Sequence, residues 1–80
     1  MKLIVLHEAF NNLSVALYAQ GYLEEAVRAC KRAIEINPKY IEAYINLGNI
    51  KLKGDNLDEA LVSFASAQEL DDKNHQTSFE

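Results

Sequence analysis

The feature that most constrains this chain is a repeat with a period of 34 residues. When residues 7–40 are placed over residues 41–74 without a gap, ten positions are identical, among them Glu8 with Glu42 and Asn12 with Asn46. Ordinary composition would give roughly two identities over this length. Self-similarity at such a period indicates that one supersecondary unit is repeated and stacked on itself.

Within each unit, apolar and small residues recur every three or four positions, which is the spacing of one face of a helix. The second half of each unit carries the clearer stripe, made of Leu23, Ala26, Val27, Cys30 and Ala33 in the first unit and of Leu57, Ala60, Leu61, Phe64 and Ala67 in the second. The first halves carry shorter stripes, made of Leu6, Phe10, Leu13 and Leu17, and of Tyr44, Leu47 and Gly48. The sequence therefore predicts two helices per unit.

Turn-forming residues separate these stripes. Gly21 and the segment 54–56 divide the two halves of each unit, and Pro38 ends the helix before it because its ring disfavours a helical conformation at Asn37. Gly54 comes one residue earlier in its unit than Gly21, so the third helix should be shorter and its turn one residue longer. Asn56 is placed to cap the last helix, with Glu59 three residues on.

These signals predict an all-α fold of two antiparallel helix-turn-helix hairpins stacked as an αα superhelix. We expect residues 1–6 to extend the first helix, residues 7–40 and 41–74 to form the two units, and residues 75–80 to form a C-terminal tail.

The residues at the helix contacts resemble the tetratricopeptide repeat, over residues 7–74. The resemblance rests on Phe10, Leu13, Ser14, Gly21, Ala26, Ala33 and Pro38 in the first unit and on Tyr44, Leu47, Gly48, Ala60, Phe64 and Ala67 in the second. It implies a solenoid in which the first helix of each hairpin lines a concave groove that binds an extended or helical peptide. The implied groove residues are Glu8, Asn11, Asn12, Val15, Tyr18 and Ala19, and Glu42, Ile45, Asn46, Asn49, Leu52 and Lys53.

Two interpretations of Asn12 and Asn46 stay open. They resemble an asparagine ladder that holds a peptide backbone in some members of this family, since an amide both donates and accepts. Alternatively, they join one helix to another within the protein. A different kind of member clamps acidic carboxyl-terminal tails, but of the five clamp positions, occupied here by Asn11, Val15, Asn46, Gln76 and Glu80, only Asn46 matches, so we expect no acidic ligand.

The last predicted helix is apolar over more than one stripe, and a helix of that kind expects to be covered. We expect the edge formed by Leu61, Val62, Phe64 and Ala65 either to pair with a second copy about a two-fold axis or to be covered by further repeats of a longer array.

Little in the sequence favours a catalytic or metal-binding function. The lone cysteine, Cys30, falls inside an apolar stripe and excludes an internal disulfide, and His7 and His75 have no partner at metal-ligand spacing. The net charge of −4 argues against nucleic acid, and the apolar run at residues 3–6 is too short for a signal peptide or a membrane span. We expect a cytoplasmic protein that is not an enzyme and needs no cofactor or metal.

The expected function is therefore recognition of another protein or peptide by a scaffold or adaptor. Glu8 and Glu42 edge the implied groove and Val15, Ile45 and Leu52 line its floor, so the favoured partner has apolar anchors and some positive charge. Self-assembly as a homo-oligomer is the alternative.

Overall fold

The structure is made of helices joined by short connections. The computed structural model describes residues 5–76, with the side chains of 74–76 left out, and within that range no residue lies in a strand. The helices are α1 (Leu6–Gln20), α2 (Leu23–Ile36), α3 (Ile41–Lys53) and α4 (Leu57–Gln76). The predicted all-α fold is confirmed. Helix α4 continues into the segment expected to be a tail, while the rest of that segment, with Glu80, and residues 1–4 of the expected extension lie outside the described residues.

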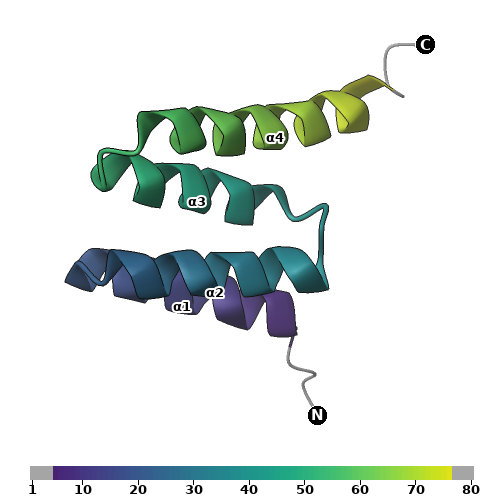
Figure 1. The fold of residues 1–80 in the computed structure, drawn as a ribbon. Helices are drawn as coiled ribbons and strands as arrows, with labels where there is room; N and C mark the ends of the chain where they lie inside the picture. The colour runs from purple at the N-terminus through teal and green to yellow at the C-terminus, as the bar shows by residue number, and fades with distance from the viewer. Residues whose placement is uncertain (1–4, 77–80) are drawn as a thin grey trace.

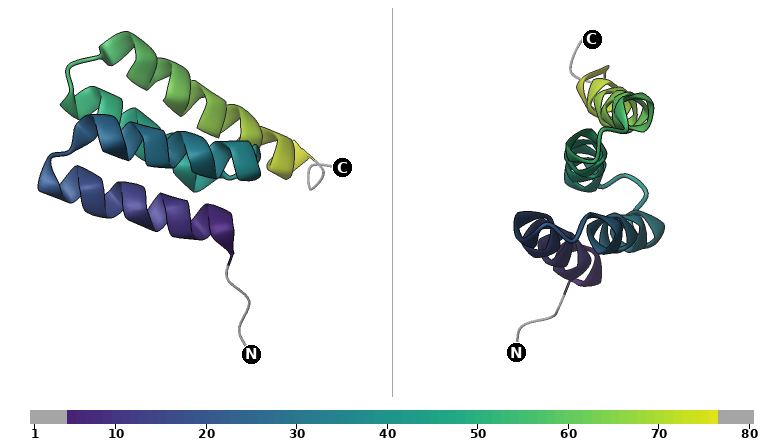
Figure 2. Two further views of the ribbon diagram at one scale, coloured as in Figure 1. Left: turned by 60° about the horizontal axis from the view of Figure 1, so that its bottom comes forward. Right: turned by 60° about the vertical axis from the view of Figure 1, so that its left-hand side comes forward.

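The helices form two antiparallel hairpins, α1 with α2 and α3 with α4, and the second hairpin stacks on the first (Figure 1). Helix α3 packs against α2 and, over a smaller area, against α1. The view along the helices shows α3 between the first hairpin and α4 (Figure 2, right). Helices α2 and α3 therefore form the joint between the hairpins.

The two hairpin turns differ as the sequence predicts. Helix α1 has 15 residues and α3 has 13, and three residues rather than two separate the helices of the second hairpin. The residue in the left-handed conformation is Gly21 in the first turn, with φ 89°, and Asp55, one repeat later, in the second, with φ 64°. Aspartate visits this region more readily than most side chains because its short polar group bonds locally.

The helix ends follow their local signals. Helix α2 stops at Ile36, and Asn37, directly before Pro38, has an extended φ of −136°. The Asn37 side-chain oxygen then accepts a hydrogen bond from the Lys39 backbone N–H at 3.2 Å. At the start of α4, Asn56 Oδ1 accepts the Glu59 backbone N–H at 3.4 Å, as a capping residue does.

The core lies at the joint. Ala26 and Cys30 of α2 and Leu47 and Ile50 of α3 form a buried cluster, against which five further side chains pack, namely Leu17, Tyr18, Leu23, Val27 and Ile34. Within the second hairpin, a Cβ placed on Gly48 would lie 2.6 Å from the Phe64 ring, so the glycine allows the ring to approach its helix closely. The buried Cys30 matches its predicted place in the core.

Three leucines that the helical stripes assign to packing are exposed instead, and the sequence interpretation was wrong for them. They are Leu6, Leu13 and Leu57. Leu61 is exposed as well, as expected for the edge of the last helix. Their stripes are real, but a stripe becomes core only where a neighbouring helix covers it. Leu47 is buried at the joint, whereas Leu13, the same position one repeat earlier, is 48% exposed.

Candidate functional site

The first helices of the two hairpins enclose a small hollow. It has a volume of about 160 Å³ and is lined by Ser14, Val15 and Tyr18 of α1 and by Asn46, Asn49 and Ile50 of α3. Three other hollows on the described residues are more open. Of the residues implied as a groove, Val15, Tyr18, Asn46 and Asn49 meet here. Ser14 and Ile50 were missed as lining residues because their small size and apolar character mark them equally well for helix packing.

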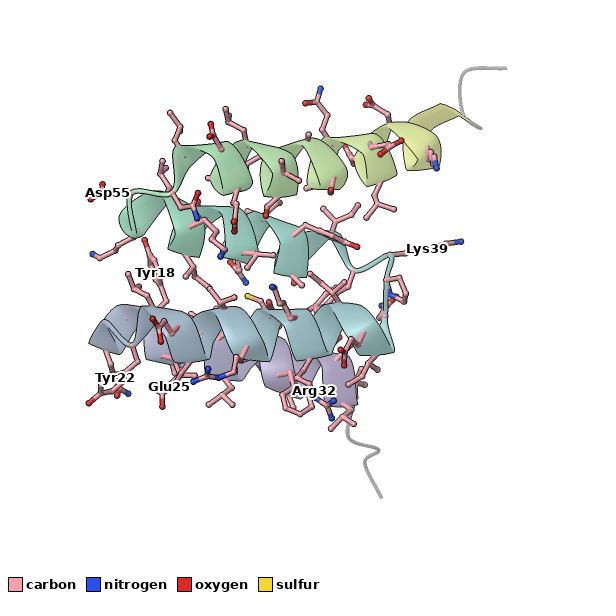
Figure 3. The ribbon with its side chains drawn as sticks, in the orientation of Figure 1. Tyr18, Tyr22, Glu25, Arg32, Lys39 and Asp55 are labelled. Carbon is pink, nitrogen blue, oxygen red and sulfur yellow. The ribbon has the colours of Figure 1, made fainter. Side chains whose placement is uncertain are left out.

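One end of this face carries an aromatic ring and a positive charge. The Lys53 ammonium lies 5.7 Å from the centre of the Tyr18 ring, within range of a cation–π contact. Tyr18 extends from the first hairpin toward α3, at the end of the molecule where Asp55 makes its turn (Figure 3). Tyr18 thus lines the hollow and also holds the Lys53 ammonium near its ring.

The opposite end is acidic. Tyr40, just before α3, donates a hydrogen bond from its hydroxyl to Glu42 Oε1 at 3.1 Å, and its ring meets His7 edge to face with centroids 4.6 Å apart. Partial burial, followed by the carboxylates of Glu42 and Glu8, raises the pKa of the Tyr40 phenol. Glu8 and Glu42 lie in the first turns of α1 and α3, whereas Lys53 lies in the last turn of α3. The face therefore runs from negative to positive along α1 and α3.

An asparagine pair crosses from one hairpin to the other. Asn46 Nδ2 donates to Asn11 Oδ1 at 2.8 Å, and Asn11 is buried, with its backbone oxygen accepting the Ser14 hydroxyl at 2.6 Å. Asn46 therefore joins helix to helix, but through Asn11 rather than Asn12, which is exposed. The Asn46 carbonyl oxygen and its second N–H have no other hydrogen-bond partner among the described residues.

None of the other eight implied groove residues lines this hollow. Ile45 lies in a separate, more open hollow with Ile41, Phe64 and Ala67, between α3 and α4. Leu52 is exposed on α3, and Ala19 is exposed near the end of α1.

The edge of α4 that the sequence singled out divides into two parts. Leu61, Val62 and Ala65 are exposed, while Phe64 is half-buried and turns one side of its ring to Gly48. Leu57 adds to the exposed part.

The lone cysteine of the sequence, Cys30, is buried in the core. Burial raises the pKa of the Cys30 thiol, an effect that a hydrogen bond with Ser14 partly opposes. Among residues 5–76 the structure has no group of three His, Cys, Asp or Glu side chains placed to hold a metal ion. Within the same range, every helix is too short or too polar to cross a lipid bilayer.

Comparison with known proteins places this arrangement in a family. A TPR repeat model matches residues 15–55, and a tetratricopeptide repeat model matches residues 41–74. The Protein STIP1 homolog of Dictyostelium discoideum is 41% identical over 76 residues, covering 86% of this chain and 13% of the relative. The DnaJ homolog subfamily C member 7 homolog of the same organism is 31% identical over 67 residues, covering 84% of this chain and 12% of the relative. The chain thus spans a small fraction of these curated relatives.

Proposed function

Because the chain belongs to the tetratricopeptide repeat family, we propose that it is a protein-binding adaptor whose α1 and α3 face holds a segment of another protein. The observation that carries this proposal is the apolar hollow between the two helices, with free amide atoms of Asn46 at its wall. A hollow of this size accommodates one apolar side chain, and an amide beside it suits the main chain of the ligand.

The charges along the face set the direction of the ligand. Glu8 and Glu42 occupy the beginnings of α1 and α3, and Lys53 occupies the end of α3. Ten residues of helix separate Glu8 from Tyr18, which is roughly 15 Å along the axis. The proposed ligand therefore has a positive group near the glutamates and an apolar anchor in the hollow.

The proposal is tested with synthetic peptides in which a lysine or arginine precedes a leucine or phenylalanine anchor by a span that matches this distance. The comparison peptide has glutamate in place of the basic residue. We expect the basic peptide to bind more tightly and to shift the amide NMR signals of Val15 and Asn49. Equal affinity for both peptides, or shifts confined to α2 and α4, would contradict the proposed site.

Val15→Glu is the matched variant for this test, because Val15 lines the hollow and is exposed, so the change leaves the core intact. Val62→Glu makes the same substitution on α4, far from the hollow, and serves as the control. We expect Val15→Glu to weaken peptide binding at least tenfold and Val62→Glu to leave it unchanged, with both proteins equally helical by circular dichroism.

In this proposal the chain has no catalysis of its own and works in the cytoplasm, where a lone, buried Cys30 stays reduced. A second candidate function, self-association, is favoured by the exposed leucines on α1 and α4.

A further inference from the structure

The joint between the hairpins has two halves. Helix α2 supplies a receiving face, in which Cys30 belongs to the buried cluster and Leu23 and Val27 pack against it. Helix α3 supplies an inserting face, from which Leu47 and Ile50 enter the same buried cluster. Leu23 and Val27 also share the wall of one hollow with Ile50, which confirms that these residues meet.

Both halves of this joint recur on the outside of the molecule, one repeat away. The positions that match the receiving face lie on α4, where Leu57, Leu61 and Phe64 replace Leu23, Val27 and Cys30. The positions that match the inserting face lie on α1, where Leu13 and Ala16 replace Leu47 and Ile50. Leu61 is 57% exposed, and Ala16 is exposed beside Leu13.

We propose that copies of this chain stack head to tail, with α4 of one copy receiving α1 of the next. The new contact continues the joint that the chain already forms between α2 and α3, in the same register. Such a contact is heterologous, since its two sides differ, and it leaves both outer faces free at the ends of every assembly. Association therefore proceeds beyond the dimer.

The side chains of the two outer faces compensate one another in volume. In the inner joint, small Cys30 and large Ile50 share the buried cluster. In the outer joint, Phe64 and Ala16 take those places, so the larger side chain moves to the receiving face and the smaller to the inserting face. Volume-conserving exchanges of this kind are the ones that packed interfaces tolerate best.

Two features make the outer joint weaker than the inner one. The hydrogen bond between Asn11 and Asn46 has no equivalent, because Ile45 and Asn12 stand at the matching positions. Each copy also carries a net charge of −4, so the copies repel one another at low ionic strength. We expect association to be reversible and to strengthen as salt is added.

The arrangement differs from a two-fold dimer in the residues that it uses. Val62 and Ala65 match Arg28 and Lys31, which are exposed on α2 and lie outside the inner joint. Head-to-tail stacking therefore needs Leu61 and Leu13 but leaves Val62 free. A two-fold contact between α4 helices needs α4 alone.

The test is light scattering after size separation of the full chain, from micromolar to millimolar concentration. The parent is expected to pass through twice its mass of 9.0 kDa and beyond as its concentration rises. Leu13→Glu and Leu61→Glu, each alone, should lose this association and remain monomeric, because each blocks one face. Mixed in equal amounts, they should form a one-to-one complex that grows no further, because one intact face remains on each.

The controls separate the possible occupants of these faces. Val62→Glu should associate like the parent, and the double variant with both glutamates should stay monomeric even when either single variant is added. Because Leu13 and Leu61 are exposed, all variants should keep the parent's circular dichroism. A parent that is monomeric at every concentration, a Leu13→Glu variant that still dimerises, or a mixture that forms no complex would overturn the proposal. The second of these results would indicate a two-fold dimer through α4.

Discussion

The inner joint and the outer faces of this molecule are built from matching positions one repeat apart, yet their environments differ. Leu47 is 9% exposed and Leu13 is 48% exposed, although each is the leucine that follows an asparagine in the same turn of its unit. In a repeat protein, stability comes from each unit and from the interfaces between neighbours. The difference teaches that the energetic value of a repeat position depends on whether a neighbour covers it.

The largest expected effect comes from truncating the two leucines of this comparison. Leu47→Ala should lower the free energy of unfolding by ~2–5 kcal/mol, because it removes a buried side chain and leaves a cavity. Leu13→Ala should cost less than about 1 kcal/mol at low protein concentration, in line with its exposure. Urea unfolding followed by circular dichroism measures both.

Equal losses of stability for the two variants in dilute solution would contradict the idea that coverage decides the contribution of each leucine. The Leu13→Ala measurement should also be repeated at high protein concentration. If a second copy covers Leu13 there, Leu13 would contribute to stability as Leu47 does.

A smaller effect is expected where the two hairpins use different pairs at one contact. Ser14 and Cys30 pack together in the first hairpin, and Gly48 and Phe64 do so in the second. Gly48→Ser should lower the free energy of unfolding by ~1–3 kcal/mol, because the new side chain pushes the Phe64 ring. The higher helix propensity of serine relative to glycine should offset a few tenths of a kcal/mol of this loss.

In a Phe64→Cys background the same Gly48→Ser change should cost nothing, because it recreates the pair of the first hairpin. A double-mutant cycle of thermal unfolding measures the coupling. Equal costs in both backgrounds would mean that the ring moves aside freely.

The asparagines provide the next comparison. Asn46→Ala removes the donor to the side-chain oxygen of the buried Asn11 and should lower the free energy of unfolding by ~1–3 kcal/mol. Asn12→Ala, one repeat earlier and exposed, should change stability by no more than about 0.5 kcal/mol. Chemical denaturation distinguishes the two, and a large loss for Asn12→Ala would show that the open end of the molecule is less free than its exposure indicates.

Most of the fold follows from local signals in the sequence. The period of 34 residues gave the repeated unit, helical spacing gave two helices in it, and Gly21, Asn56 and Pro38 gave their ends. The shift of Gly54 correctly predicted a shorter α3. Helical spacing alone could not predict which stripe residues are covered, because Leu13 and Leu57 have the pattern of core residues and their exposure depends on which helix lies next to them.

The candidate site was predictable only in part, for a related reason. The family resemblance selected residues on the first helix of each hairpin, and Val15, Tyr18, Asn46 and Asn49 do surround one hollow. Which asparagine Asn46 meets depends on how far α1 and α3 slide past one another, and no repeat alignment carries that offset. In the structure, Asn46 bonds to Asn11, which is 35 residues away, and not to Asn12, which is 34 residues away.

The smallest expected effect concerns a charge pair that occurs in the second hairpin. Lys51 Nζ lies 2.7 Å from Glu59 Oε1, whereas the position matching Lys51 in the first hairpin is Leu17, a half-buried apolar residue. The Lys51 ammonium holds the pKa of the Glu59 carboxyl below its ordinary range. Since the folded pKa is the lower one, the carboxylate stabilises the fold above its unfolded pKa of about 4.3, and this contribution disappears as the pH falls through the folded pKa. The thermal unfolding temperatures of the parent and of Glu59→Gln should therefore differ slightly at neutral pH and converge in acid, and added salt should reduce the difference.

The control is a Lys51→Leu background, which reproduces the residue of the first hairpin. There, the difference between Glu59 and Glu59→Gln should no longer depend on pH, and a dependence that persists would have to come from a partner other than Lys51.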